Sequence, residues 1–198
     1  RVHGPAPAIS LPYDRLVLFH LFPGGSGAKQ KSWPVQNWMD LARCLAGKGW
    51  VIGFTGAAGD REAVATLIHQ LGLPQDQCIS LAGKLNLSEL CSVMANARLL
   101  VTIDTGVAHI ATALDTPVVG LYGPTRFERW GSRNVRATGL NSPHPASGYI
   151  NYGFEQHPQG NEVMASLLFD TVLASVEKRL NETRDQSSST RLAKMSEI

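Results

Sequence analysis

The sequence predicts an α/β fold, a Rossmann-like, doubly wound parallel sheet with helices on both faces. Short continuous apolar runs alternate along the chain with segments whose apolar residues recur at helical spacing. Strands of a parallel sheet are buried on both faces, so they consist of continuous apolar runs. With 198 residues, 43% of them hydrophobic and 17% charged, the chain is long enough for one globular domain with a sizeable core.

The first half of the chain supplies three predicted strands and three predicted helices. The strands are expected at Leu16–Leu21, Trp50–Thr55 and Ile79–Leu81. The helices are expected from Pro34 to Ala46, from Ala63 to Leu71 and from Ser88 to Ala95. Pro34 suits the start of a helix, and glycines such as Gly47 and Gly72 end one.

The second half predicts strands at Leu99–Ile103, Pro117–Tyr122 and near Val135–Ala137, and helices over Val107–Leu114 and Leu167–Leu180. The Pro-, Gly-, Ser- and Asn-rich segment Gly139–Gly160 is expected to be irregular. Residues 1–15 are expected to form an interdomain linker, residues 16–182 the folded domain and residues 183–198 a disordered tail. A chain that starts at Arg1 is interpreted as a piece of a longer protein.

Charge and cysteine content exclude several classes of protein. The net charge of +2 is too balanced for an electrostatic nucleic-acid binder, so no nucleic-acid partner is expected. No apolar run approaches the ~20 residues that span a bilayer. Cys44, Cys78 and Cys91 have no metal-binding spacing and are expected to be free thiols in a reducing compartment.

Ligands of open parallel sheets bind beyond the carboxyl ends of the strands, so the loops after the strands are the candidate site. The first loop, Phe22–Pro34, is Gly-rich, includes Ser26, Gly27 and Lys31, and leads into a helix. Backbone N–H groups, the helix N-terminus and Lys31 together fit a phosphate cradle. The loop matches neither the Walker A nor the dinucleotide fingerprint, and a solvated surface loop is the alternative interpretation.

Two further loops have a structural as well as a functional interpretation. In Gly56–Glu62, Asp60 or Glu62 could cap the following helix or accept hydrogen bonds from ribose hydroxyls. In Gly123–Arg126, Thr125 could form part of a turn or contact phosphate or sugar.

The loop Asp104–His109 carries the most specific signal. Asp104 ends a strand, Thr105 and Gly106 expose backbone N–H groups, and His109 lies one turn into the next helix. A lone histidine on a helix is often a buried core residue. Here carboxylate, hydroxyl, amides and imidazole gather in one loop, which favours a binding site.

The motifs together resemble a known family. Lys31-Ser32-Trp33-Pro34, Gly56-Ala57-Ala58-Gly59-Asp60, Leu81-Ala82-Gly83-Lys84-Leu85-Asn86-Leu87, Asp104-Thr105-Gly106-Val107-Ala108-His109 and Tyr122-Gly123-Pro124-Thr125 occur in this order. Their order and spacing resemble the C-terminal, donor-binding domain of glycosyltransferase family 9, the ADP-heptose:lipopolysaccharide heptosyltransferases. The resemblance implies that the chain is the C-terminal half of a two-domain GT-B glycosyltransferase.

The resemblance also implies roles for single residues. Lys31 and Ser26, with Gly27 beside them, would contact the donor diphosphate, and Asp60 or Glu62 would hold the ribose. Leu85 would line the adenine pocket. The residues expected around the heptose and diphosphate are Asp104, Thr105, Gly106 and His109. Lys31, Asp104 and His109 are the expected catalytic residues of this chain.

By the same resemblance, transfer from ADP-heptose to a lipopolysaccharide core or related glycan inverts the anomeric centre without a metal or other cofactor. The general base and the lipid-linked acceptor would belong to an N-terminal domain outside this chain, so this chain alone would transfer little or nothing. A cytoplasmic location, with peripheral contact at the inner membrane, is implied. The alternatives are a transferase using another nucleotide sugar, a non-catalytic nucleotide-binding module and a protein-interaction domain.

Overall fold

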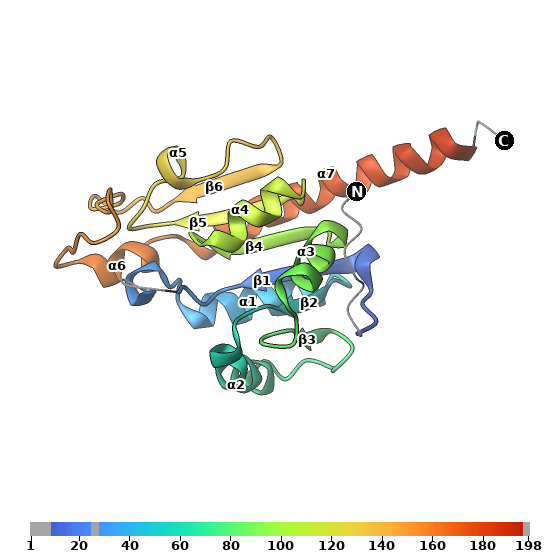
Figure 1. Ribbon diagram of the computed structural model, residues 1–198, viewed down its shortest axis with the longest axis horizontal. Helices are drawn as coiled ribbons and strands as arrows, with labels where there is room; N and C mark the ends of the chain where they lie inside the picture. The colour runs from blue at the N-terminus through green and yellow to red at the C-terminus, as the bar shows by residue number, and fades with distance from the viewer. Residues whose placement is uncertain (1–8, 25–27, 196–198) are drawn as a thin grey trace.

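Six parallel strands form one sheet in the order β3-β2-β1-β4-β5-β6 (Figure 1). The computed structural model describes residues 9–24 and 28–195, without the side chains of Ala28 and of residues 184–195. The strands are β1 (Leu16–His20), β2 (Val51–Phe54), β3 (Cys78–Ser80), β4 (Leu99–Ile103), β5 (Val118–Tyr122) and β6 (Ala137–Asn141). The predicted Rossmann-like parallel sheet is therefore confirmed.

Helices connect and cover the strands. The α-helices are α1 (Val35–Ala46), α2 (Arg61–Leu71), α3 (Leu87–Asn96), α4 (Gly106–Ala113), α5 (Phe127–Trp130), α6 (Gly160–Ala165) and α7 (Phe169–Met195). Three short 3-10 helices are η1 (Tyr13–Arg15), η2 (Ala28–Lys31) and η3 (Ala58–Asp60). Asn86 and Glu89 form a reciprocal capping box that starts α3.

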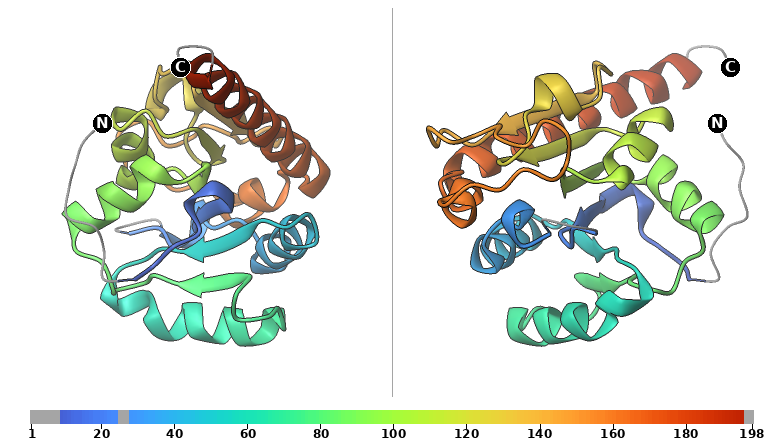
Figure 2. Two further views of the ribbon diagram at one scale, coloured as in Figure 1. Left: turned by 90° about the vertical axis from the view of Figure 1, so that its right-hand side faces the viewer. Right: turned by 60° about the vertical axis from the view of Figure 1, so that its left-hand side comes forward.

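The two faces of the sheet carry separate apolar cores. Alternate strand residues such as Phe19, Ile52 and Val101 pack against α1, α2 and α7. The intervening residues, such as Leu18 and Leu100, pack against α3 and α4. The left view of Figure 2 separates these layers, with α3 and α4 in green on one side and α7 in red on the other. Burial on both faces explains why the strands are continuous apolar runs.

The register aligns the carboxyl ends of the central strands. Phe19 pairs with Phe54 of β2 on one side and with Val101 of β4 on the other. The chain returns from the β3 edge to β4 beside β1, which makes a topological switch point there. The loops after β1, β2 and β4 therefore lie next to one another.

The structure differs from the sequence prediction beyond β5. A last short strand was expected near Val135–Ala137, and the structure has one, but its bounds were wrong, because β6 covers Ala137–Asn141 and pairs with β5 throughout. The expected irregular segment 139–160 therefore begins inside a strand and ends at Gly160, the first residue of α6. All five β6 residues are only half-buried, so the hydrophobic pattern of this edge strand is weak.

Helix α7 is longer than its apolar pattern. Val172, Val176 and Leu180 are buried against the sheet, and the Thr183 carbonyl accepts a hydrogen bond from Arg98. The helical backbone continues to Met195, into the segment for which a disordered tail was predicted. The predicted domain limits at residues 15 and 182 stay predictions.

Candidate functional site

An ion pair joins the loop after β1 to the loop after β4 at the carboxyl edge of the sheet. Lys31, the last residue of η2, places its ammonium 3.1 Å from Oδ2 of Asp104, which directly follows β4. The Asp104 side chain is 9% exposed and that of Lys31 is 23% exposed. The partly buried ammonium of Lys31 therefore lies where the neighbouring strands β1 and β4 end.

The sequence around Lys31 is anchored by the motif Ser32-Trp33-Pro34. The indole of Trp33 is buried, packs edge-on against Trp38 and donates a hydrogen bond to the Leu167 carbonyl at 2.9 Å. Pro34 caps α1, which begins at Val35. This buried tryptophan fixes the end of the loop and so limits where Lys31 can reach.

The N-terminus of α4 opens beside Asp104. Thr105 is the N-cap residue in extended conformation, and its side chain makes no capping hydrogen bond. A Cβ built on Gly106 would meet no atom within 4 Å, so the space above the first turn is open. Unpaired backbone N–H groups and the helix dipole make such a terminus attractive to anions.

His109 follows one turn later on α4. Its side chain is exposed, so the alternative of a buried core histidine is wrong. Lys31, Asp104, Thr105, Gly106 and His109 are thus gathered at one end of the sheet, as the sequence predicts.

The second loop brings Asp60 to the same edge. Asp60 Oδ2 accepts a hydrogen bond from the Ala57 N–H at 2.7 Å, which caps η3, and its charge acts on the nearby His20. The capping interpretation therefore holds for one carboxylate oxygen. Glu62 is exposed on α2 and lines a different groove, between Phe22 and Val35. Of the two carboxylates, Asp60 is the one whose charge acts on His20, the last residue of β1.

The loop after β3 docks tightly on the loop after β2. The Gly83 N–H donates to the Gly56 carbonyl at 2.9 Å, and Arg61 donates to the Gly83 carbonyl. Gly83 has φ of +61°, and a Cβ there would lie 2.7 Å from Ala58 Cα, so only glycine fits this approach. Leu85 follows this contact and packs, half-buried, on the α3 side of the sheet.

The remaining predicted residues are placed as follows. The Thr125 side chain is 1% exposed, and its hydroxyl has no hydrogen-bond partner among the described residues. Contact with a ligand through that hydroxyl would require the β5 loop to open. Ser26 and Gly27 lie outside the described residues. Cys44, Cys78 and Cys91 are free thiols, as predicted.

No group of three or more His, Cys, Asp or Glu side chains in the described ranges is placed to hold a metal ion. No helix within those ranges is long and apolar enough to cross a membrane.

The geometry agrees with a comparison against known families. The model of glycosyltransferase family 9 (heptosyltransferase) matches residues 14–151, more than half of the chain. The chain belongs to glycosyltransferase family 9. The match includes every predicted site residue from Ser26 to Thr125.

Curated relatives of this family 9 chain are heptosyltransferases. It is 40% identical over 106 residues to lipooligosaccharide heptosyltransferase 2 of Haemophilus influenzae, covering 52% of this chain and 30% of the relative. It is 32% identical over 137 residues to lipopolysaccharide heptosyltransferase 1 of Pseudomonas aeruginosa, covering 69% of this chain and 36% of the relative. The chain thus spans about a third of the length of these relatives.

Solved structures share the fold. The Escherichia coli ADP-heptose lipopolysaccharide heptosyltransferase II superposes with a TM-score of 0.71 at 24% identity, over 85% of this chain and 47% of that one. A family 9 glycosyltransferase from Veillonella parvula gives a TM-score of 0.68 at 23% identity, over 87% of this chain and 48% of that one.

One residue at this edge of the sheet was missed by sequence reasoning. His20, the last residue of β1, bonds through Nδ1 to the Thr55 hydroxyl at 2.9 Å. Its carbonyl accepts from the Thr102 hydroxyl, which also lies 3.4 Å from the Thr105 hydroxyl. Burial lowers the pKa of His20, although the Asp60 charge partly opposes this. The uncharged imidazole links the ends of β1, β2 and β4.

Tyr122 was likewise not singled out as a site residue. It ends β5, is 2% exposed and packs edge-on against Phe127. Burial, and then the charge of Asp104, raises the pKa of its phenol. The uncharged phenol of Tyr122 therefore lies near the Asp104 carboxylate. The sequence placed it at the end of a strand and at the start of the motif Tyr122-Gly123-Pro124-Thr125.

Proposed function

We propose that this chain is the donor-binding half of a GT-B heptosyltransferase that holds ADP-heptose for transfer to a lipopolysaccharide core or related glycan. The observation that carries the proposal is the Lys31–Asp104 ion pair beside the open N-terminus of α4. The chain covers less than half of the two solved family 9 structures to which it was compared, which supports a partial chain. Membership in family 9 supports the class of reaction.

The diphosphate of the donor lies between Lys31 and the first turn of α4 in this proposal. Lys31 contributes a full positive charge, and the N–H groups of Gly106 and Val107 contribute the positive end of the helix dipole. Such preorganised positive charge stabilises the diphosphate as it leaves with the bonding electron pair. No metal or other cofactor is required for this step.

The sugar lies beside Asp104 and His109. The acceptor hydroxyl oxygen attacks the anomeric carbon from the face opposite the diphosphate, and the bond to the diphosphate oxygen breaks. The configuration inverts, ADP leaves, and the acceptor proton passes to a base. That base and the lipid-linked acceptor belong to the partner domain of the full-length protein, at the cytoplasmic face of the inner membrane. This chain alone then binds donor and transfers little.

The nucleoside occupies the loops after β2 and β3. The Asp60 carboxylate oxygen that does not cap η3 is available to ribose hydroxyls, and Leu85 offers an apolar surface to the base. Asp60 is preferred to Glu62 because it lies near His20 at the end of β1.

The test is thermal unfolding of the chain with ADP, ADP-heptose, UDP-glucose and GDP-mannose. A ligand at 100 times its dissociation constant adds about 2.7 kcal/mol, a shift of roughly 5–11 °C for this size. Stabilisation by ADP, and more by ADP-heptose, is expected. A larger shift with UDP-glucose or GDP-mannose favours the second candidate, another nucleotide sugar, and no shift with any ligand contradicts the proposal.

Two variants separate a transferase from a nucleotide-binding module. His109→Ala should reduce the advantage of ADP-heptose over ADP while leaving ADP binding in place. Asp104→Asn should reduce the same advantage and also change the affinity for ADP itself, because it removes the ion-pair partner of Lys31. If both variants still bind ADP-heptose more tightly than ADP by the original factor, these side chains do not touch the sugar. That result would support a non-catalytic nucleotide-binding module.

A further inference from the structure

One ring nitrogen of His20 is available to a ligand. Its Nδ1 is bonded to the Thr55 hydroxyl at 2.9 Å, whereas its Nε2 has no hydrogen-bond partner among the described residues. Within the same ranges, Nε2 is not one of the fully buried side-chain atoms that lack a partner, so it is open to solvent. The imidazole is thus anchored at one nitrogen and accessible at the other.

The hydrogen bonds around Thr55 place the proton of the uncharged ring. The Thr55 hydroxyl has one proton, and it lies 3.2 Å from the Phe19 carbonyl, which can only accept. When the hydroxyl donates to Phe19, Nδ1 of His20 must donate to Thr55, and Nε2 keeps its lone pair. Burial lowers the pKa of His20, which keeps the ring uncharged at neutral pH. Nε2 is therefore a hydrogen-bond acceptor.

Buried threonines hold this acceptor in place. Thr55 is 2% exposed, and Thr102 is fully buried. The Thr102 hydroxyl donates to the His20 carbonyl at 3.1 Å and lies 3.4 Å from the hydroxyl of Thr105, the N-cap residue of α4. Both the backbone and the ring of His20 are anchored, so the lone pair of Nε2 has a fixed position at the end of β1.

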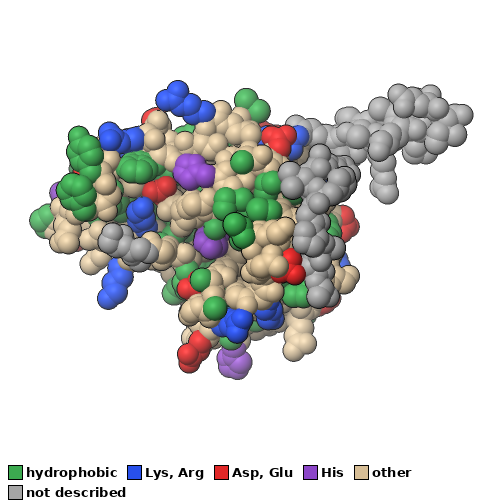
Figure 3. Space-filling view, in the orientation of Figure 1, with side chains coloured by type: hydrophobic (Ala, Val, Ile, Leu, Met, Phe, Trp, Pro, Cys, Tyr) green, Lys and Arg blue, Asp and Glu red, His purple; other side chains and the backbone are tan. Residues whose placement is uncertain are grey.

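His20 lies on the side of the sheet that carries the proposed nucleoside site. It follows Leu18 by two positions in β1, and Leu18 packs on the side covered by α3 and α4. Leu85 packs on the same side, and the charge of Asp60 acts on His20. Figure 3 shows this side of the molecule, where histidine side chains reach the surface. The Nε2 atom and the Asp60 carboxylate therefore adjoin the place proposed for the ribose.

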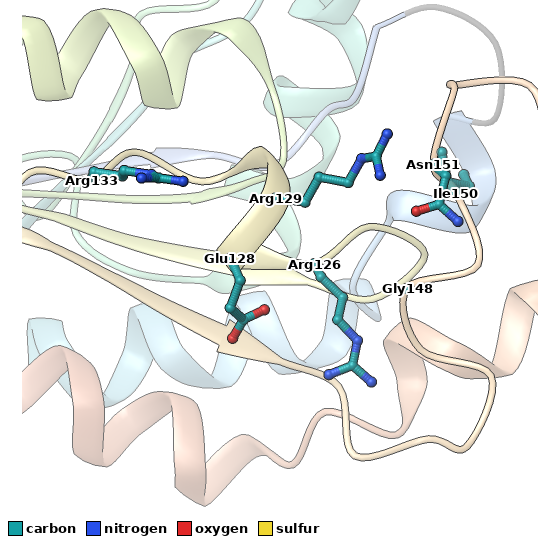
Figure 4. Close-up of a pocket in the computed structure, with 7 residues that line it drawn as sticks. All are labelled: Arg126, Glu128, Arg129, Arg133, Gly148, Ile150 and Asn151. Atoms are coloured by element: carbon teal, nitrogen blue, oxygen red, sulfur yellow. The ribbon is translucent and has the colours of Figure 1, made fainter.

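The recess beside α5 has no such convergence of binding groups. It encloses about 460 Å³ between α5 and the loop 148–151. Figure 4 shows its three arginines, Arg126, Arg129 and Arg133, pointing in different directions, and Glu128 adds a negative charge among them. His20 and Asp60, in contrast, both offer acceptors, which suit a ligand that donates hydrogen bonds.

A ribose has two neighbouring hydroxyl groups, and each needs an acceptor when it is bound away from water. Asp60 offers one through the carboxylate oxygen that does not cap η3. We propose that His20 is a specificity-determining residue, whose Nε2 accepts a hydrogen bond from the other ribose hydroxyl of the bound nucleotide. This inference rests on the proposed function and deepens its nucleoside site. A site that bonds both hydroxyls selects ribonucleotides over deoxyribonucleotides.

The test compares the binding of ADP, 2′-deoxy-ADP and 3′-deoxy-ADP to the chain by isothermal titration calorimetry at neutral pH. Each analogue lacks one hydroxyl and leaves one acceptor without its partner. We expect ADP to bind more tightly than either analogue by about threefold or more.

Two variants at position 20 separate the two ring nitrogens. His20→Asn places an amide near the Nδ1 position, so it keeps a bond to Thr55 and has no acceptor at the Nε2 position. His20→Gln places its amide oxygen near the Nε2 position. We expect His20→Asn to weaken ADP binding about threefold to tenfold and to bring one analogue to the same affinity as ADP, whereas His20→Gln keeps most of the preference. His69→Asn, on the exposed side of α2, should change neither value.

Proton–nitrogen NMR correlation spectra of the imidazole give a second measurement. In the free chain we expect a protonated Nδ1 and a bare Nε2 on His20. The Nε2 signal should move when ADP is added and should not move to the same position with the analogue that lacks the bonded hydroxyl. A role of His20 in folding alone would leave this signal the same with ADP and with both analogues.

Three results overturn the inference: equal affinity of the unmodified chain for ADP and both analogues, an unchanged preference for ADP in His20→Asn, or a protonated Nε2 in the free chain. When ADP itself binds, any of these results rejects only the role of His20. Absence of ADP binding to the unmodified chain rejects the proposed function, and the inference with it.

Discussion

At the scale of single residues, the Lys31–Asp104 contact sets the charge of the candidate site. A carboxylate 3.1 Å from the ammonium keeps Lys31 pointed into the site and offsets part of its charge. Pairing makes burial of either group less costly. When a diphosphate arrives, it competes for the same ammonium, so Lys31 should be the side chain that ADP binding depends on most.

We expect Lys31→Ala to weaken ADP binding by roughly 1.5–3 kcal/mol, the scale of a charge-assisted hydrogen bond. Lys29→Ala is the matched control, because Lys29 lies in the same 3-10 helix, is exposed and makes no described ion pair. Isothermal titration calorimetry with ADP measures both. Equal losses in the two variants would mean that the loop attracts anions only by its general charge.

His20 makes stability depend on pH. Burial lowers its pKa from the usual 6.5. The unfolded chain therefore binds a proton on this residue at a higher pH than the folded chain. Above pH 6.5 the free energy of unfolding should include the full contribution of the uncharged His20. This contribution should be lost as the pH drops from 6.5 toward the pKa of His20 in the folded chain.

His20→Asn should flatten this part of the profile, because asparagine can still bond the Thr55 hydroxyl but does not titrate. Urea unfolding at several values between about pH 7.5 and 5.5 measures the effect. An unchanged slope in the variant would show that other groups, such as carboxylates, cause the acid sensitivity.

At the scale of elements, the packing of β2 requires a glycine at position 53, because leucine side chains leave no room for a larger residue. A Cβ on Gly53 would lie 2.9 Å from Leu18 Cδ2 and 3.2 Å from side-chain carbons of Leu16 and Leu81. We expect Gly53→Val to cost about 1–3 kcal/mol through overpacking. Gly59→Ala is the control, since its Cβ would meet nothing within 4 Å. Chemical denaturation compares the two, and a neutral Gly53→Val would show that the leucines can repack.

Elements differ in how well their sequence predicts them. Strands β1 to β5 were predicted to within one or two residues, and in the four central ones, β1, β2, β4 and β5, burial on both faces makes each a continuous apolar run. Strand β6 lies at the edge and is half-buried, so its sequence Ala-Thr-Gly-Leu-Asn carries little pattern. The segment 142–159 takes its shape from long-range contacts such as Gly148 to Gly123, which no local periodicity encodes.

In the candidate site, too, some residues could be predicted from the sequence and others could not. The loops that carry Lys31, Asp60 and Asp104 could be identified as candidate binding loops, because the order of the strands predicts where ligands bind. His20 could not, because the predicted strand Leu16–Leu21 places it inside an apolar run rather than at the end of a strand. Its place in the site comes from Thr55 and Thr102 on the neighbouring strands. Such a contact becomes visible only when the register of β1, β2 and β4 is known.

At the scale of the whole molecule, two apolar cores share one sheet. Leu180 of α7 belongs to one core and Met94 of α3 to the other, and both side chains are almost fully buried. Each strand contributes alternate residues to both cores, so neither face can separate without breaking the sheet that supports the other. We therefore expect one cooperative unfolding transition.

The last prediction uses this geometry. Leu180→Ala and Met94→Ala should each lower stability by about 2–5 kcal/mol and leave the urea m-value unchanged. Trp33, Trp38 and Trp50 all lie in the first core, so tryptophan fluorescence reports mainly on that face, whereas far-ultraviolet circular dichroism reports on every helix. In a cooperative domain the two signals change together even in Met94→Ala, which alters only the opposite face. If dichroism fell before fluorescence in that variant, α3 and α4 would unfold separately. The α4 terminus and Lys31 would then belong to units of different stability, and ligand binding would have to hold them together.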